Sequence, residues 1–236
     1  LDNAARHQLD AEVADMAARG LRVIGLAEAT HPTGELPESQ RGFVFRFLGL
    51  AGLSDPIRET VPEAIAQCRS AGIRVVVITG DFPATAKAIA AQAGISTNEV
   101  LTGDVLAELD DAELQARVGS ANVFARIMPE QKLRIVNALK ANGEIVAMTG
   151  DGVNDAPSLK AAHIGVAMGG RGTDVAREAS SLVLLKDDFG SIVAAVRLGR
   201  RIYDNLRKAM SFIFAVHLPI AGLALLPLVT GYPVIF

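Results

Sequence analysis

Short apolar runs recur along the chain up to residue 185, and segments with helical spacing separate them. The runs hold four to eight residues each and lie at 43–50, 73–78, 145–148, 164–168 and 182–185. Runs of this length are typical of strands that are buried on both faces. The segments between them that are predicted helices lie at 62–71, 84–93, 130–141 and 156–162. This alternation predicts an α/β fold, in which helices cover both faces of a parallel sheet.

Three further segments complete the outline. Residues 10–29 are expected to hold a helix followed by a strand at 21–27, and 31–40, with two prolines and a glycine, reads as a surface loop. Residues 104–118 are acidic and amphipathic, which favours a solvated helix over a binding site. In sheets of this kind, ligands bind at the carboxyl ends of the strands. The residues that follow each strand are therefore the candidates for chemistry.

The pattern changes near the C-terminus. The last 25 residues, 212–236, contain no Asp, Glu, Lys or Arg. A helix that crosses the hydrocarbon core of a bilayer needs about 20 mostly apolar residues. The alternative is a buried apolar hairpin in a soluble protein, because Pro219, Pro227 and Pro233 can break helices. Prolines are nevertheless tolerated in membrane helices, so we expect a transmembrane segment and a lipid bilayer as partner.

Basic residues precede this apolar segment. They are Arg197, Arg200, Arg201, Arg207 and Lys208, and they stand against one acid, Asp204. Basic residues that flank an apolar span usually mark the cytoplasmic side of a membrane. We therefore expect residues 1–211 to be cytoplasmic.

Composition excludes some classes of protein. Half of the residues are hydrophobic, which is too many for a disordered chain. The net charge of −3, from 23 basic and 26 acidic residues, gives no reason to expect nucleic acid as a partner. The single cysteine, Cys68, cannot form an internal disulfide, which fits a reducing compartment. Because the chain begins with Leu1 and carries no signal sequence, we expect a fragment of a longer protein.

Two of the predicted strands end in the same three letters. The sequence T-G-D stands at 79–81, after the run at 73–78, and again at 149–151, after the run at 145–148. Glycine lets the backbone approach a ligand closely. The hydroxyl and the backbone N–H groups of such a turn can hold phosphoryl oxygens. We therefore expect both turns to belong to a phosphate-binding site.

The second turn carries more acidic chemistry than the first. It continues as T-G-D-G-V-N-D-A-P over 149–157 and offers Asp151, Asn154 and Asp155 within five residues. Clustered carboxylates repel one another unless a cation lies between them. Mg²⁺ takes one or two carboxylates and completes its octahedron with water and phosphate oxygens. We expect a magnesium–phosphate site here, and the alternative is an Asn/Asp-rich turn that caps a helix.

Two shorter motifs could contribute to the same site. In F-A-R-I-M-P-E-Q-K, at 124–132, Pro129 suits the first turn of a helix. Lys132 then lies near the positive end of that helix and could neutralise a phosphoryl group, although on its own it would be an ordinary surface lysine. By itself, D-P-I-R at 55–58 is a turn with a possible Asp55–Arg58 pair.

Together these motifs resemble the P-type ATPases, which pump cations across membranes through an aspartyl-phosphate, and the calcium-pump-like branch in particular. The resemblance covers almost the whole chain and rests on D-P-I-R, both T-G-D turns, F-A-R…P-E-Q-K, T-G-D-G-V-N-D-A-P-S-L-K at 149–160, G-T-D-V-A-R-E-A-S at 172–180 and G-R-R-I-Y-D-N at 199–205. It implies a haloacid-dehalogenase-like phosphorylation domain over 55–189. The end of the nucleotide-binding domain and a hinge strand would precede it at 1–54. The stalk and the fifth transmembrane helix of a multi-pass protein would follow at 190–236.

The resemblance also implies roles for the residues of the second turn and of Lys132. Asp151 and Asp155 would ligate Mg²⁺, and Asn154 would support the metal and the phosphate. Lys132 would offset the charge of the phosphoryl group. Together with Thr79, Lys132 and Asp151 would be the catalytic residues.

A second set of residues would bind the nucleotide, ATP. Thr79 and Gly80 would hold phosphoryl oxygens, and Asp81 would lie beside the nucleotide. Arg126 would help to hold ATP, and Arg22 matches an arginine that contacts the nucleotide in the family.

The sequence also departs from the family. The family's nucleophile is the Asp of D-K-T-G-T, which normally lies upstream on the first strand of the same sheet, and no such run occurs here. An aspartyl nucleophile attacks the γ-phosphate, and charge neutralisation supplies most of the catalysis. We therefore expect this chain to be inactive alone and to need the missing N-terminal part of the same pump.

The cargo and the class of protein leave alternatives. Ca²⁺ is the first expectation for the transported cation, but Ile220 stands where calcium pumps have an acidic ligand, and His217 where they have an Asn. A hydrophobic side chain cannot supply an oxygen to Ca²⁺. One rival is a soluble haloacid-dehalogenase-like phosphatase, which would need a D-x-D-x-T start that is also not found. The other is a non-catalytic regulatory partner of a complete pump.

Overall fold

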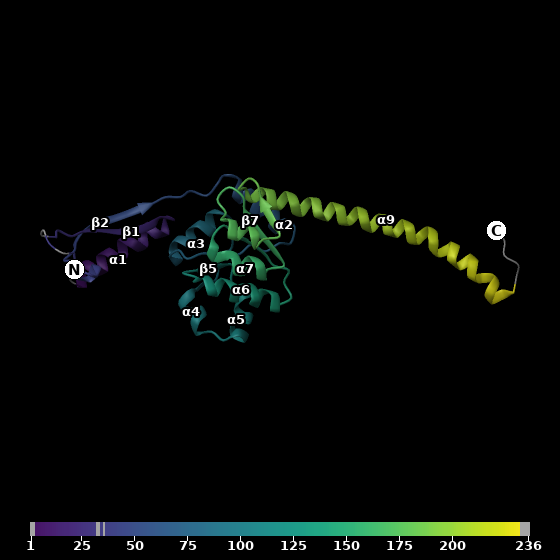
Figure 1. Ribbon diagram of the computed structural model, residues 1–236, viewed down its shortest axis with the longest axis horizontal. Helices are drawn as coiled ribbons and strands as arrows, with labels where there is room; N and C mark the ends of the chain where they lie inside the picture. Colours follow the sequence, from purple (N-terminus) through teal and green to yellow (C-terminus); the bar gives the residue numbers. More distant parts are fainter. Residues whose placement is uncertain (1–2, 32–33, 35, 232–236) are drawn as a thin grey trace. The chain divides into compact units, whose positions relative to one another are not determined.

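The structure is a computed structural model that describes residues 3–31, 34 and 36–231 (Figure 1). The chain divides into two compact units, Leu1–Phe189 and Gly190–Phe236. The first unit holds the sheets and all the predicted site residues. The second consists almost entirely of one long helix.

Strands β3 (Val77–Ile78), β4 (Val100–Thr102) and β5 (Val123–Ala125) form a parallel sheet in the order β3-β5-β4. Helices α2 (Thr60–Ser70) and α3 (Pro83–Gln92) contribute to the apolar cluster on one face. Helices α4 (Gly103–Glu108), α5 (Asp111–Val118) and α6 (Pro129–Ala141) contribute to the cluster on the other face. The sheet is therefore a three-layer sandwich, as the alternation of strands and helices predicts.

The central strand β5 shows why both faces are covered. Val123 and Ala125 pack in the cluster with Ile65 and Ala90, whereas Phe124 packs with the helices on the opposite face. None of the three β5 side chains has any solvent-exposed surface. Because neighbouring side chains of a strand point to opposite faces, an all-apolar strand needs cover on both.

A second parallel sheet has the order β6-β7-β8, from β6 (Ala147–Gly150), β7 (Ile164–Met168) and β8 (Leu182–Leu184). Helices α7 (Ala156–Ala161) and α8 (Asp174–Glu178) pack on it through a small cluster around Leu159. Apolar side chains on or just before its edge strands stay open to solvent, among them Leu182 in β8 (51% exposed) and Ile145, two residues before β6 (76%). The sequence predicted one parallel sheet, and the structure has two.

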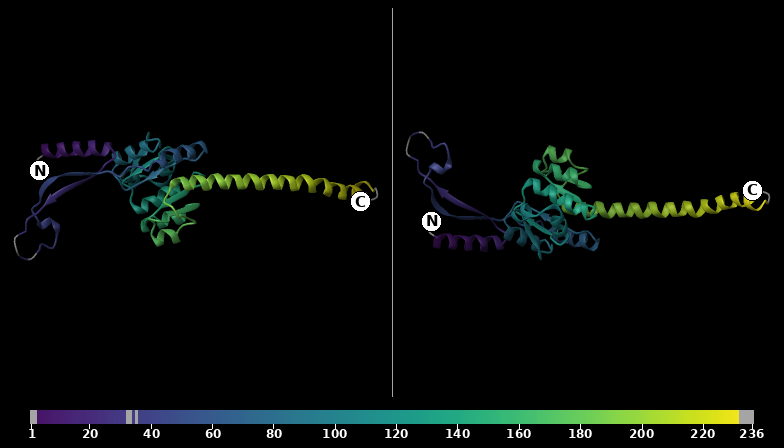
Figure 2. Two further views of the ribbon diagram at one scale, coloured as in Figure 1. Left: turned by 90° about the horizontal axis from the view of Figure 1, so that it is seen from above. Right: turned by 90° about the horizontal axis from the view of Figure 1, so that it is seen from below.

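The prediction of a buried parallel strand at 43–50 is wrong. Strand β2 (Arg46–Leu53) pairs antiparallel with β1 (Arg22–Glu28) in a separate hairpin, and most of its side chains are exposed (Figure 2). Helix α1 (Asn3–Ala18) lies along the hairpin, and Met16 packs over Gly52. An apolar run measures how much surface a strand can bury, not the direction of its partner, so its length alone could not separate the two cases.

A predicted helix and a predicted loop also differ from the sequence prediction. The predicted single helix at 104–118 is broken into α4 and α5, because the Asp110 carboxylate caps α5 by accepting from the Glu113 N–H at 2.8 Å. In the predicted loop at 31–40, residues 32, 33 and 35 lie outside the described residues, and a short 3₁₀ helix, η1 (Gln40–Gly42), follows.

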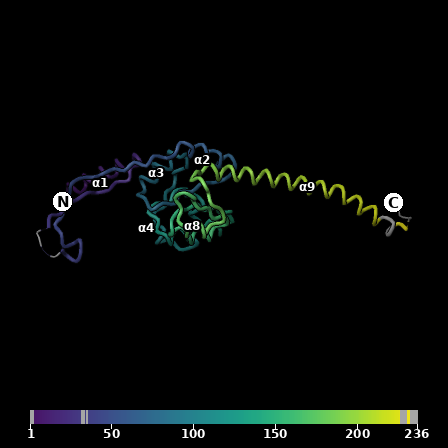
Figure 3. Tube along the Cα trace, turned by 45° about the horizontal axis from the view of Figure 1, so that its top comes forward, coloured from purple at the N-terminus to yellow at the C-terminus, as the bar shows by residue number. Residues whose placement is uncertain are grey.

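The second unit is built on α9 (Phe189–Thr230), which is one uninterrupted helix (Figure 3). It runs through Pro219 and Pro227, so the described residues do not form the alternative apolar hairpin. Residues 197–225 are all exposed. Over Phe189–Leu225 it is the one described helix that is long and apolar enough to cross a membrane by length and composition. Residues 232–236 of the predicted span lie outside the described residues.

Candidate functional site

The first T-G-D turn follows β3 and is fastened to the residues that follow β5. The Thr79 N–H donates to the Phe124 carbonyl at 2.9 Å, and the Arg126 N–H donates to the Asp81 carbonyl at 3.0 Å. These bonds join two motifs that lie 45 residues apart in the sequence, T-G-D and F-A-R. They meet because β3 and β5 are parallel neighbours whose carboxyl ends share one edge.

Within this turn, the side chains of Thr79 and Asp81 bond to each other. The Thr79 hydroxyl donates to the Asp81 carboxylate at 2.8 Å, and the Asp81 N–H donates back to the hydroxyl at 3.1 Å. The Thr79 hydroxyl is therefore engaged inside the turn, whereas Gly80 is exposed at its tip. A side chain on Gly80 would meet only the Ile127 carbonyl, at 3.8 Å.

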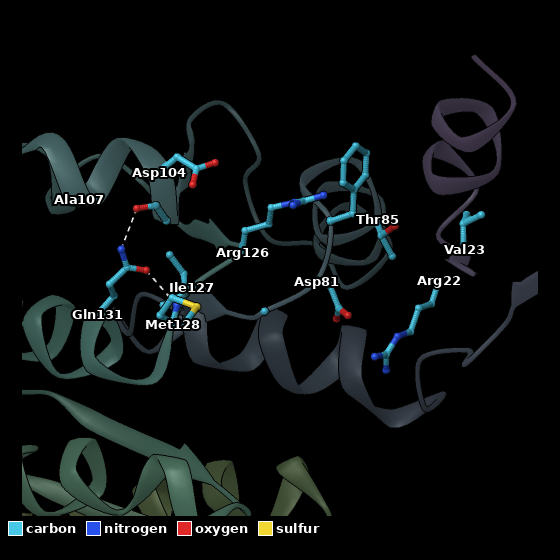
Figure 4. A pocket seen from close by; sticks show the side chains of 13 residues that line it. Arg22, Val23, Asp81, Thr85, Asp104, Ala107, Arg126, Ile127, Met128 and Gln131 are labelled. Carbon is cyan, nitrogen blue, oxygen red and sulfur yellow. Dashed lines mark hydrogen bonds between the residues drawn. The ribbon is translucent and has the colours of Figure 1, made fainter. Parts of the chain in front are cut away.

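A cleft of about 630 Å³ opens beside the first turn (Figure 4). Four of the predicted nucleotide-binding residues line it: Arg22 at the start of β1, Gly80 and Asp81 in the turn, and Arg126 after β5. The Arg126 guanidinium lies over the Phe82 ring, 5.2 Å from its centroid. Arginines with exposed heads and a cation–π contact can hold phosphates and an aromatic base.

The second T-G-D turn is organised around a buried carboxylate. After β6, the short 3₁₀ helix η2 (Val153–Asp155) turns the Asp155 side chain back toward the strand. The Gly152 N–H donates to Asp155 at 3.2 Å, and a Cβ at Gly150 would lie only 2.6 Å from the Asp155 Cβ. Glycine at 150 is required for this close approach.

Lys132 and Asp155 form an ion pair that joins α6 to the second turn. Lys132 Nζ lies 2.6 Å from Asp155 Oδ1, and the side chains are only 20% and 10% exposed. The predicted Lys132 thus sits at the second turn, opposite the acid that was predicted to bind metal. Removing one partner of a buried ion pair of this kind strongly destabilises the fold, because the other charge is left buried without compensation.

Asp151 and Asn154 differ from Asp155 in that both are exposed. The Asp151 carbonyl accepts from the Thr173 N–H at 2.9 Å, which fixes the turn, but no described residue bonds to the Asp151 carboxylate. Two carboxylates and an amide form an oxygen donor set of the kind that suits Mg²⁺. The described residues contain no group of three acidic, His or Cys side chains that could hold a metal ion.

The structure therefore separates the predicted residues into two groups. Arg22, Gly80, Asp81 and Arg126 line the cleft. Lys132 and Asp155 are in contact at the second turn, beside Asp151 and Asn154. Thr79 belongs to the first turn but lies outside the lining of the cleft.

Sequence reasoning missed three residues that support the site. The Phe82 ring makes a cation–π contact with the Arg126 guanidinium. Gln131 donates to the Gly103 carbonyl at 2.7 Å and accepts from the Met128 N–H at 2.9 Å, which ties α4 to the start of α6. The backbone of Thr173 holds Asp151, and its hydroxyl caps α8. Only Thr173 had a signal, because a Thr before a short helix is a typical N-cap.

Comparison with known proteins identifies the family. The family model for haloacid dehalogenase-like hydrolases matches residues 5–163. The chain is 46% identical to a calcium-transporting ATPase of Bacillus subtilis over 90% of its own length and 24% of that protein. It is 47% identical to the cation-transporting ATPase pma1 of Synechocystis over 90% of its own length and 24% of that protein.

A sodium/potassium-transporting ATPase alpha-A subunit of Artemia franciscana is 39% identical over 93% of this chain and 26% of that protein. The chain thus spans about a quarter of the length of these curated relatives. The resemblance predicted from the motifs is confirmed, and so is the predicted fold class. The chain belongs to the haloacid dehalogenase-like hydrolase family, and within that family it is similar to a segment of the P-type cation-transporting ATPases.

Proposed function

We propose that this chain is part of an ATP-driven cation pump and supplies half of its phosphoryl-transfer site. The observation that carries the proposal is that the chain holds two T-G-D turns with different surroundings. One lies at a cleft lined by two arginines, and the other is built around the Lys132–Asp155 ion pair. In this assignment the first turn and the cleft bind the nucleotide. The second turn binds the metal and the transferred phosphoryl group.

The other half of the site is a strand from the part of the pump that precedes this chain. β3 and β6 are edge strands of two separate parallel sheets, and each has a T-G-D motif at its carboxyl end. Ala147 in β6 is exposed, and only two residues of the apolar run at 73–78 have strand pairing. An apolar strand with an open edge is an aggregation liability unless another strand covers it. One inserted parallel strand would join the sheets and bring its own carboxyl end to both turns.

That inserted strand would carry the nucleophilic Asp, which this chain lacks. Its carboxylate would stand as a third acidic ligand beside Asp151 and Asp155 and would strengthen the binding of Mg²⁺ at the second turn. When bound, Mg²⁺ would neutralise charge on the phosphoryl oxygens. Lys132, held by Asp155, would direct its ammonium group at the same oxygens.

The residues of the cleft would orient the nucleotide. Arg126, held over Phe82, and Arg22 at the start of β1 would neutralise phosphates of ATP. Because Arg22 belongs to the β1–β2 hairpin and Arg126 follows β5, nucleotide binding would depend on how this hairpin is placed against the β3-β5-β4 sheet. The apolar span of α9 would cross the membrane, with residues 1–211 on the cytoplasmic side. The cargo would be a cation, and Ca²⁺ is the first to test.

The direct test is a chimera in which residues 1–236 replace the matching segment of the Bacillus subtilis calcium-transporting ATPase. We expect a phosphoenzyme labelled by the γ-phosphate of ATP and cleaved by hydroxylamine, as an acyl phosphate is. Asp151→Asn should abolish the label, whereas Asp111→Asn, at an exposed acid of α5, should leave it unchanged. A folded chimera without label would contradict the proposal.

The chain alone supplies the complementary test. We expect no ATP hydrolysis above background from the purified 236-residue chain. Hydrolysis that Asp151→Asn removes would mean that this chain holds its own nucleophile. In that case the phosphatase-like alternative would be favoured over the half-site.

A further inference from the structure

The part of α9 that precedes its apolar span has two opposite faces. Over residues 197–210 every side chain is exposed, and the basic side chains are Arg197, Arg200, Arg201, Arg207 and Lys208. With about 100° of rotation per residue, these five fall within an arc of about 120°. The apolar side chains Leu198, Ile202, Leu206 and Met210 fall within about 120° centred on the opposite side. The juxtamembrane segment is therefore strongly amphipathic.

The basic residues precede the apolar span at different distances along the helix, so they lie at different distances from the membrane. Arg207 and Lys208 stand five and four residues before Phe212, where the charge-free segment begins. At a rise of about 1.5 Å per residue they lie about 6–8 Å from that boundary. The headgroup layer on one side of a bilayer is about 5–8 Å thick. Arg197, 15 residues before Phe212, lies about 22 Å away, beyond this layer and beyond the Debye length of about 8 Å.

We propose that Arg207 and Lys208 form a binding site for anionic phospholipid headgroups in the cytoplasmic leaflet. The occupant follows from charge complementarity and position, because two cations stand at headgroup depth on a helix that enters the bilayer. The only acid on this face is Asp204, so its net charge is strongly positive. This inference rests on the membrane crossing of the proposed function, and it adds a lipid preference that the crossing alone does not require.

The sequence offers a clean reporter for the test. The chain has no Trp, so Phe212→Trp would give a single fluorophore at the boundary of the apolar span. The chain would be reconstituted into vesicles of phosphatidylcholine with a minor share of phosphatidylglycerol, in which either the first or the second lipid carries bromine, a contact quencher. The ratio of the two quenching efficiencies, corrected for composition, measures the enrichment of the anionic lipid beside the helix.

We expect phosphatidylglycerol to be enriched at least about fivefold beside the helix that keeps all its basic residues, since each Lys or Arg near the surface contributes about that factor. Arg207→Gln with Lys208→Gln should abolish the enrichment. Arg197→Gln with Arg200→Gln removes the same charge farther from the membrane and should preserve most of it. Asp204→Asn should increase the enrichment, and about 0.5 M salt should reduce it.

Two results would overturn the inference, and they are distinguishable. Equal quenching by both lipids, or equal losses in the two double variants, would contradict the lipid site while leaving the membrane crossing intact. In that case an acidic protein segment would be the better occupant of the basic face. Quenching by neither lipid would mean that the fluorophore introduced by Phe212→Trp is not at a bilayer, and the membrane part of the proposed function would fail with it.

Discussion

The two T-G-D motifs share three residues, and each lies at the carboxyl end of a parallel strand, yet their side chains are arranged differently. In the first, Asp81 bonds to Thr79 within the turn, and Pro83 starts α3 directly afterwards. In the second, Gly152 and η2 bring Asp155 into the turn, where it meets Lys132, and Asp151 stays exposed. The residues that follow the motif therefore decide which carboxylate is free to bind a ligand.

The largest expected difference between the two turns follows from removing the Lys132 ammonium group at the second turn. Lys132→Met leaves the Asp155 carboxylate buried without its partner and should lower the free energy of unfolding by about 3 kcal/mol. Asp81→Asn, which weakens one hydrogen bond of the half-buried first turn, should lower it by about 1 kcal/mol or less. Urea unfolding of the chain in detergent, followed through the amide signals of β5, measures both.

A double variant tests the reason for this difference. Asp155→Asn removes the unpaired charge, so Lys132→Met together with Asp155→Asn should be less destabilised than Lys132→Met alone. Additive losses would mean that the two side chains do not act as a pair.

The glycines of the two turns give the next largest contrast. Gly150→Ala would place a methyl group 2.6 Å from the Asp155 Cβ, and such overpacking should destabilise the chain by about 2 kcal/mol. Gly80→Ala meets its nearest atom at 3.8 Å, an ordinary contact, so its effect should stay within about 0.5 kcal/mol. Thermal unfolding of the two variants side by side would detect the difference, and equal shifts would contradict the proposed geometry.

The N-cap of α8 also stabilises the second turn, and its contribution can be measured. Thr173→Ala removes the side chain that accepts from the Ala176 N–H, and the loss of such an N-cap should destabilise the chain by about 1 kcal/mol. Ser158→Ala is a matched control in α7, because the Ser158 hydroxyl is fully buried and has no hydrogen-bond partner in the described structure. Its removal should be neutral or slightly stabilising. A loss at Ser158 as large as that at Thr173 would point to a partner for the hydroxyl.

The smallest expected effect lies away from both turns and concerns pH. The Ser120 hydroxyl and the Arg117 guanidinium donate to Glu99 at 2.6 and 2.9 Å, and these bonds lower the pKa of the Glu99 carboxyl. The stabilisation is fully present above the ordinary pKa of Glu and is lost as the pH falls through the lowered value. Between about pH 5 and pH 3, Glu99→Gln should therefore lose about 0.5 kcal/mol less stability than the chain that keeps Glu99. Identical pH profiles would contradict the pKa shift.

Much of this arrangement could be predicted from the sequence, because local signals specify it. β7 matches the prediction at 164–168, and α2, α3, α6 and α7 differ from theirs by one or two residues. Pro83 and Pro129 stand in the first turns of their helices and mark where those helices begin. The first T-G-D motif follows β3, as expected, whereas Thr149 and Gly150 of the second are the last two residues of β6, so that strand lies two residues later than predicted.

The rest depends on partners that lie far away in the sequence or outside the chain. β4 and β5, of three residues each, are too short for periodicity to reveal and exist because they pair with each other. The Lys132–Asp155 contact joins residues 23 apart through the packing of α6 on the second turn. The metal role predicted for Asp155 stays a prediction, as do the other assigned roles. The bond to Lys132 shows which interaction a metal would have to share.

The most direct measurement of the proposed division between the two turns is a titration with Mn²⁺, a paramagnetic substitute for Mg²⁺, followed by the amide signals of the chain. We predict that the signals of residues 150–155 broaden first, that those of 79–82 stay sharp at the same concentration, and that Asp151→Asn removes the effect. Broadening centred on 79–82, or equal broadening of both turns that survives Asp151→Asn, would contradict the account.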